Sequence, residues 1–312
     1  MTVQDYPHPR AMWRAVVDTA QAVAKATGRP NTAVLREYLY ARILDRVFAD
    51  PDSPWVLKGG TALLVRDADA RHSRDVDLLH QHGTLSDAVE QLRAAVTLDL
   101  GDQLQFQVTR THVVAGGQQG VDGIRVGIEA FAGTKKIDAF HIDLVVGSVM
   151  TAEPDEREAP SAINVLGIPA PTVRLYPVID HVADKVCATE AIYASGLPSS
   201  RARDLVDLVV IARAETMSLH ALRAAIASER YHRGLPPRAD FSPPAGWTSQ
   251  YPELAKATSH CADLALDDAV HLVRVFLSPA LVPPDGPQDR EWDPKTQTWA
   301  PVQSRHPDRV PW

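Results

Sequence analysis

The sequence predicts an α+β fold with a mixed β-sheet, followed by a mostly helical C-terminal domain. Two amphipathic segments, residues 11–27 and 32–49, have the apolar spacing of helices. The middle of the chain alternates apolar and polar residues and is rich in β-branched side chains, which is typical of strands. Beyond residue 173 nearly every periodic segment has helical spacing. Strands gathered in the middle, with helices before and after, favour a layered α+β or α/β arrangement.

The composition is that of an ordinary globular protein, with 45% apolar and 23% charged residues among 312. There is no run of eighteen apolar residues, and the first fourteen residues lack the apolar centre of a signal peptide. We therefore expect a cytoplasmic protein that does not span a membrane. Cys187 and Cys261 lie in apolar helical segments and are expected to be reduced core thiols.

The net charge of −7 argues against a protein that coats nucleic acid by bulk attraction, but it is compatible with a local basic groove. Basic residues cluster at three places, and for each cluster the alternative is an ordinary solvated surface. The clusters are Arg66, Arg71 and Arg74; Lys135 and Lys136; and Arg230, Arg233 and Arg238.

The chain divides into four predicted parts. Residues 1–150 form a domain with two N-terminal helices, and residues 151–172, rich in proline and charge, form a linker. Residues 173–281 form the helical domain. Residues 282–312 contain seven prolines and are predicted to be either disordered or laid over the surface as an extended arm. The strands in the first domain are predicted at 104–114, 124–133 and 139–147, and the later helices near 177–194, 200–214, 218–228, 251–259 and 262–277.

One stretch, residues 56–79, carries the residue types of a phosphate and metal site. Gly59 and Gly60 let the backbone come close to a ligand, and the helix that follows Thr61 presents free N–H groups to an anion. On a strand, Asp75 and Asp77 point to the same face, where two carboxylates favour a hard cation such as Mg²⁺. Taken alone, such a pattern is more often a plain turn followed by a solvated strand edge.

A further acidic residue lies within a predicted strand later in the chain. Asp143 interrupts the apolar run Phe140–Val145, where a buried charge is costly unless a cation or a donor compensates it. Asp138, at the preceding turn, is the competing candidate. Its turn context makes Asp138 the more ordinary residue, so we prefer Asp143.

In the helical half, Lys185 has no acidic neighbour at helical spacing that would pair with it on its own helix. Taken alone, such a lysine is more often an exposed side chain whose stem lies along the surface; if it faces the predicted carboxylate strands, it could bind a phosphate ligand as a point charge. Asp204 and Asp207 lie three residues apart on one helical face, where the alternative is a surface pair between Arg203 and Asp207. His72 and His141 adjoin the proposed site residues but are predicted to point away from them.

The motifs Leu57-Lys58-Gly59-Gly60-Thr61-Ala62-Leu63 and Arg71-x-Ser73-x-Asp75-Val76-Asp77-Leu78 resemble the AbiEii-type toxins of bacterial toxin–antitoxin systems, within the DNA polymerase β-like nucleotidyltransferases. This resemblance implies a polymerase β-like catalytic domain that transfers NMP from an NTP and releases pyrophosphate. It also matches Asp143 to the third carboxylate, Lys185 to a functional lysine, and Asp207, with Asp204 in support, to a later acidic helix.

The expected mechanism uses two Mg²⁺ ions, or Mn²⁺, held by Asp75, Asp77 and Asp143. The β- and γ-phosphates would bind Gly59, Gly60 and Thr61, and Lys185 would neutralise pyrophosphate. Ser73, two residues before Asp75, would bind phosphate or be a place where modification blocks the site. These residues come from both predicted domains, so we expect the active site to lie in a cleft between the two.

The family resemblance implies an RNA acceptor, with the tRNA 3′ end as the leading candidate, and a cognate antitoxin. The acidic net charge is better matched to a small acceptor, as in enzymes that adenylylate aminoglycosides. A third alternative is a non-catalytic module that only binds nucleotides or partners. Against that alternative, four costly charges, Asp75, Asp77, Asp143 and Lys185, are all present.

Overall fold

A computed structural model describes residues 6–73, 75–114, 123–159, 161–163, 167–192, 196, 198–282 and 290–302. The chain forms two compact units, and each is described here by itself. The first consists of residues 1–148 and 153–176, and the second of residues 149–152 and 177–312.

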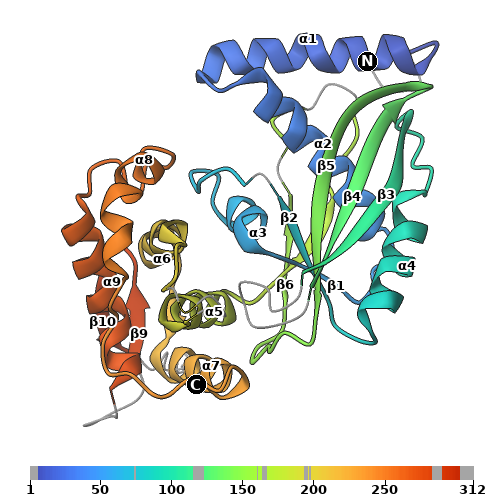
Figure 1. Cartoon of the computed structure of the whole chain (residues 1–312). Coiled ribbons are helices and arrows are strands. Elements are labelled where there is room, and N and C mark those ends of the chain that lie inside the picture. Colours follow the sequence, from blue (N-terminus) through green and yellow to red (C-terminus); the bar gives the residue numbers. More distant parts are fainter. Residues whose placement is uncertain are drawn as a thin grey trace, which may run out of the picture. The chain divides into compact units, whose positions relative to one another are not determined.

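The first unit is built on a seven-stranded mixed sheet with the strand order β3-β4-β5-β2-β1-β7-β6, which confirms the predicted α+β class (Figure 1). The β2–β5 and β1–β7 pairs are parallel and the other pairs are antiparallel. The strands are β1 (Trp55–Lys58), β2 (Val76–His80), β3 (Leu104–Val114), β4 (Gly123–Ala132), β5 (Lys135–Val146), β6 (Asp155–Glu158) and β7 (Thr172–Leu175). The helices are α1 (Pro9–Thr27), α2 (Asn31–Val47), α3 (Gly59–Arg66) and α4 (Leu85–Val96).

Helices α1, α2 and α4 provide apolar side chains for one core that covers one face of the sheet. Strand alternation places Val76 and Leu78 of β2 and Ile142 of β5 in this core, each fully buried. The ring of Tyr40 on α2 meets Phe140 of β5 edge to face, with centroids 5.0 Å apart. The side chains that alternate with these core residues along β2 and β5 point to the opposite face of the sheet, where the polar residues lie.

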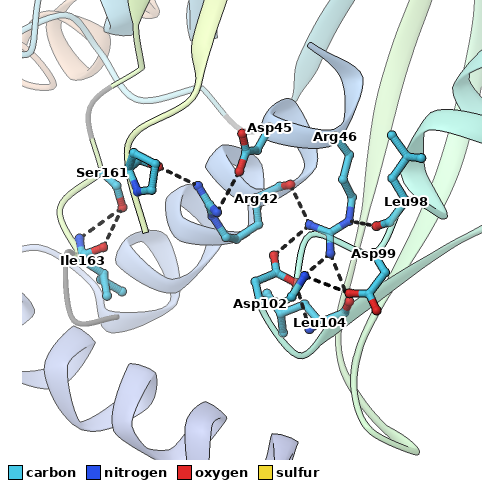
Figure 2. A network of polar contacts seen from close by, with 11 residues as sticks. Arg42, Asp45, Arg46, Leu98, Asp99, Asp102, Leu104, Ser161 and Ile163 are labelled. Atoms are coloured by element: carbon cyan, nitrogen blue, oxygen red, sulfur yellow. Dashed lines mark hydrogen bonds and ion pairs between the residues drawn. The ribbon is translucent and has the colours of Figure 1, made fainter. Parts of the chain in front are cut away.

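A buried ion pair fixes the position of α2 (Figure 2). The guanidinium of Arg46 donates to both carboxylate oxygens of Asp102, at 2.8 and 2.7 Å, and to the carbonyls of Arg42, Leu98 and Leu104. Such a pair is tolerated in a core because the remaining donors also find partners. The network ties α2 to the turn before β3, so the polar residues near the start of α2 have defined positions.

The prediction that residues 151–172 form a linker is wrong for most of this segment. Residues 153–176 belong to the first unit, where β6 and β7 extend the sheet. The sequence did not show this because both strands are four residues long and β6, Asp155–Glu158, is charged throughout and exposed. Their pairing depends on the distant strand β1, through Leu57 and Leu175.

The second unit is mostly helical. Its helices are α5 (Val178–Glu190), α6 (Ala202–Ala214), α7 (Leu219–His232), η2 (Ala245–Ser249), α8 (Tyr251–Ala255) and α9 (Leu266–Leu281), and its three short strands are β8 (Met217–Ser218), β9 (Arg290–Asp293) and β10 (Thr298–Pro301). Both cysteines are buried free thiols. Burial raises the pKa of Cys261 to about 12, so this thiol stays protonated at neutral pH.

The predicted tail contains a hairpin that is neither disordered nor only a surface arm. Strands β9 and β10 pair with each other, and β9 also pairs with β8. Trp292 is fully buried, and its indole N–H donates to the carbonyl of Ala212 at 2.7 Å. Its ring lies 4.9 Å from that of Phe276 on α9. Burial of this large aromatic ring explains why the hairpin packs on the helices although prolines lie on both sides of it. Residues 283–289 and 303–312 lie outside the described residues.

Candidate active site

A row of polar residues crosses five strands of the first unit on the face opposite the core. Asp77 of β2 stands beside Lys58 of β1 on one side and beside Asp143 of β5 on the other. Asp143 in turn stands beside Arg125 of β4, and Arg125 beside His112 of β3. Directly paired residues share a face, so the two carboxylates are neighbours in the row. The structure therefore places Asp143 next to Asp77, as the sequence predicts.

Gly59 is the residue against which the Asp77 carboxylate packs. Its φ of 65° is in the left-handed region, and an added Cβ would lie 2.6 Å from Cγ of Asp77 and still closer to Oδ2. Only glycine allows this approach. The start of α3 is thereby brought against a carboxylate of the proposed metal site, and the N-cap residue, Lys58, makes no side-chain capping hydrogen bond there.

Asp75 lies just before β2 and is held through its backbone. The hydroxyl of Thr61 donates to the Asp75 carbonyl at 2.8 Å, and the hydroxyl of Ser73 donates to the same oxygen at 3.0 Å. Ser73 also packs against Gly60, where an added Cβ would lie 3.1 Å from both its Cβ and its Oγ. In this structure, Thr61 and Ser73 thus position Asp75 and do not present their hydroxyl protons to a ligand.

Asp143 and Asp138 each bind an arginine, but on different faces of β5. Arg125 donates to both oxygens of Asp143 at 2.7 Å, whereas Arg36 of α2 binds Asp138 at 2.8 and 3.1 Å. The pKa of Arg125 is raised, chiefly by the Asp143 hydrogen bond and further by Asp75 and Asp77. The three carboxylates therefore act together on one guanidinium, and Asp138 belongs to the helix-covered side.

The donor set fits a hard divalent cation, because it consists of carboxylate oxygens on adjacent strands. Among the described residues, the oxygens of Asp75, Asp77 and Asp143 do not all approach within 4.8 Å of one another. Asp143 is engaged with Arg125 instead. A cation shared by all three carboxylates requires Asp143 to exchange Arg125 for the metal.

The loop that leads to Asp75 is clamped by the N-terminal half of α2. Glu37 accepts a hydrogen bond from Arg29 and lies 2.7 Å from Nδ1 of His72, the residue before Ser73. Burial alone would raise the pKa of Glu37, but the hydrogen bonds from His72 and Arg29 outweigh it, and the net pKa lies below the ordinary 4.5. His72 therefore anchors the loop to α2 through Glu37.

Because its pKa is depressed in the folded state, Glu37 stabilises the fold above pH 4.5, and this contribution is lost as the pH falls through the lower folded value. We expect Glu37→Gln to lower the free energy of unfolding by about 1–2 kcal/mol at pH 7. The difference from wild type should shrink as the pH falls below 4.5 through the lowered pKa of Glu37 in the folded state. Urea denaturation across this range measures it, with the exposed Glu90→Gln on α4 as control. If the difference in unfolding free energy between wild type and Glu37→Gln does not change with pH, the Glu37 carboxylate does not stabilise the loop in this way.

In the second unit, Lys185 of α5 binds both acidic residues proposed on α6. Its Nζ lies 2.5 Å from Asp207 and 3.3 Å from Asp204, and Arg201 approaches Asp204 at 2.8 Å. The sequence identified these residues but not their pairing, because Lys185 and Asp207 are 22 positions apart and come together only when α5 packs on α6. All three are buried, so the lysine is a precisely held donor and not a mobile surface charge.

Several predicted basic surfaces are in fact internal ion pairs. Arg230 binds Glu190, with the shorter contact at 2.5 Å, and Arg233 binds Asp184 and Glu229. Arg66 binds Asp155 and the carbonyl of Tyr176. These arginines are taken by carboxylates and do not form a basic groove. Arg74 lies outside the described residues.

Sequence reasoning missed two charged residues of the row. Lys58 is buried, with Nζ 3.0 Å from the Ser148 hydroxyl and 4.1 Å from the centre of the Tyr176 ring. The sequence feature that could have indicated Lys58 is its position directly before the two glycines, next to the first free N–H groups of α3. Arg125 gave no local signal, because only the register of β4 against β5 places it beside Asp143.

The model of one protein family, described as the nucleotidyl transferase AbiEii toxin of type IV toxin–antitoxin systems, matches residues 42–274. The chain belongs to the AbiEii nucleotidyltransferase toxin family. It is therefore a nucleotidyltransferase, which takes a nucleoside triphosphate as substrate, and a toxin of this kind has a cognate antitoxin. The match includes the glycine turn, all three carboxylates and the Lys185 cluster.

One of the solved structures that the chain resembles, MenT4, agrees with this AbiEii assignment at the level of the fold. MenT4, a nucleotidyltransferase toxin from Mycobacterium tuberculosis, is 18% identical, with 84% of this chain and 97% of MenT4 covered and a TM-score of 0.52. JHP933 from Helicobacter pylori is 15% identical, with 80% and 93% covered and a TM-score of 0.44. No curated protein matches the sequence significantly. Among the described helices, none is long and apolar enough to cross a membrane.

Proposed function

We propose that this AbiEii protein transfers a nucleoside monophosphate from a nucleoside triphosphate to an RNA acceptor, and that the acceptor is the 3′ end of tRNA. The observation that carries the proposal is the in-register placement of Asp77 beside Asp143, with the glycine turn of α3 packed against Asp77. It combines a carboxylate pair and a backbone anion cradle at one place. Nucleotidyl transfer needs both features.

The residues divide the work as follows. Asp75, Asp77 and Asp143 would hold Mg²⁺ or Mn²⁺, which would stabilise charge on the attacking and leaving oxygens. The N–H groups of Gly59, Gly60 and Thr61 at the start of α3 would bind the phosphates. Thr61 and Ser73 fix the backbone of Asp75, so that its carboxylate keeps one orientation.

The Lys185 cluster forms the second part of the proposal. Asp204 and Asp207 hold the Lys185 ammonium in one place, which would lower the entropic cost of its donation to a phosphate ligand. The two carboxylates also compensate the positive charge of Lys185. We therefore expect Lys185 to act mainly as an oriented hydrogen-bond donor and less through its net charge. Asp207 makes the shorter contact, and we assign it the larger functional role.

The test incubates the purified protein and Mg²⁺ with total tRNA and, in turn, each of four α-³²P-labelled triphosphates. We expect one or two triphosphates to label tRNA at its 3′ end, with release of pyrophosphate. Label on an aminoglycoside or another small acceptor, and none on RNA, would replace the RNA acceptor by the small-molecule alternative. Triphosphate binding without transfer to any acceptor would favour a non-catalytic module.

A further inference from the structure

The polar face of β3, β4 and β5 continues beyond the carboxylates toward the edge of the sheet. From Asp143 the row passes to Arg125 and then to His112 on the edge strand β3. Both Arg125 and His112 are exposed. The buried side chains Phe106, Val126, Ile128, Ile142 and Leu144 of the same strands point to the opposite face, where they join the core with α1, α2 and α4. A charged, solvent-facing strip on β3 and β4, which contains Arg125 and His112, is therefore continuous with the row that contains Asp77 and Asp143.

A second arginine is placed on this strip by two features of the backbone. The register of β3 against β4 shifts between Val108 and Thr111, a bulge that redirects the side chains within it. Arg110 lies in this bulge, and its Cγ is 3.3 Å from the position of a Cβ on Gly127. Gly127 alternates with the buried Val126 and Ile128, so its missing side chain leaves room on the outer face. Bulge and glycine together lay the stem of Arg110 along the strip.

The strip is cationic although the whole chain carries a net charge of −7. Its acidic residue Glu129 is bound by Lys136 at 2.5 Å, and Asp143 is bound by Arg125. Within the part of the chain that the structure describes, Arg110 and His112 make no ion pair. Arg110 and Arg125 stand over β4 positions two residues apart, which corresponds to about 7 Å along the strand.

We propose that Arg110 and Arg125, with His112, form the subsite that receives the sugar–phosphate backbone of a single-stranded RNA acceptor. This inference rests on the proposed function. Guanidinium groups bind phosphate with the same forked geometry that Arg125 uses for Asp143, so a phosphate can take over that contact. Arg125 stands beside Asp143 and Arg110 stands two β4 positions along the strand from it, so together they guide the RNA so that its terminal hydroxyl arrives beside Asp77 and Asp143.

The decisive variant is Arg110→Ala, because Arg110 makes no contact with the carboxylates in the described structure. We expect its KM for tRNA to rise about 3- to 10-fold, with kcat and the KM for the triphosphate unchanged. The slope of log KM against log salt should fall by about 0.7, the value for one lost phosphate contact on a single strand. Arg110→Lys should restore most of the affinity. Arg110→Ala combined with Arg125→Ala should raise the KM further, and kcat should also change because Asp143 loses its partner.

The matched control is Arg93→Ala on α4, an exposed arginine on the covered side of the same sheet. Melting temperatures of all variants check folding. If Arg110→Ala has the KM and salt slope of Arg93→Ala while wild type labels tRNA, the subsite is wrong and the proposed function stands. If wild type labels only a small acceptor, the proposed function is wrong in its acceptor, and the subsite is overturned with it.

Discussion

Replacement of Asp75 and Asp77 together by alanine is expected to lower nucleotide transfer at least about a thousandfold, which corresponds to about 4 kcal/mol of transition-state stabilisation. Asp77 lies in register with Asp143, and Asp75 is fixed by two hydroxyls on its carbonyl. Without both carboxylates, Asp143 alone would have to hold the metal ions. Transfer of α-³²P label to tRNA measures the effect, and the melting temperature shows whether the variant is folded.

A pair of single substitutions on β5 decides which residue is the third carboxylate. Asp143 and Asp138 are each bound by one arginine on a neighbouring element, so the two substitutions remove similar contacts. We expect Asp143→Asn to lose most transfer and Asp138→Asn to keep most of it, since only Asp143 stands in the row with Asp77. The reverse result would move the metal site to the α2 side of the sheet. Wild-type activity in the double alanine variant would remove the metal assignment altogether.

Gly59→Ala is expected to abolish transfer and to lower the free energy of unfolding by about 2–4 kcal/mol. An alanine at a φ of 65° costs about 1–2 kcal/mol, and the new methyl group would also displace the Asp77 carboxylate. The displacement turns Asp77 away from Asp143 and moves the first N–H groups of α3. Urea denaturation gives the loss of stability, and Mn²⁺ affinity measured by calorimetry reports the site independently of turnover.

Gly28→Ala is the control for backbone strain alone. Gly28 ends α1 with a φ of 70°, nearly that of Gly59, but nothing lies within 4 Å of an added Cβ. We expect a loss of about 1–2 kcal/mol in stability with full transfer activity. If Gly59→Ala also loses only this much stability and keeps full transfer activity, the contact between residue 59 and Asp77 has no role in transfer.

The local elements followed from the sequence wherever a periodic run was long enough. The segments predicted at 11–27 and 104–114 match α1 and β3 closely, because amphipathic spacing over eleven or more residues has one solution. The short strands β6 and β9 were missed. Four residues carry too little pattern, and these strands are held by contacts with β7 and with β8 and β10. Trp292 shows the same limit, since only tertiary packing buries it.

The sequence by itself determined the residues to which we assign the chemistry: the glycine turn, the pair Asp75 and Asp77, the acid at Asp143 and the lysine at 185. Residue type and strand or helix period act over a few positions, so a sequence shows them directly. Only the tertiary structure decided their partners, because strand register and helix packing join residues far apart in the chain. Arg125 on Asp143 and the two carboxylates around Lys185 are contacts of that kind.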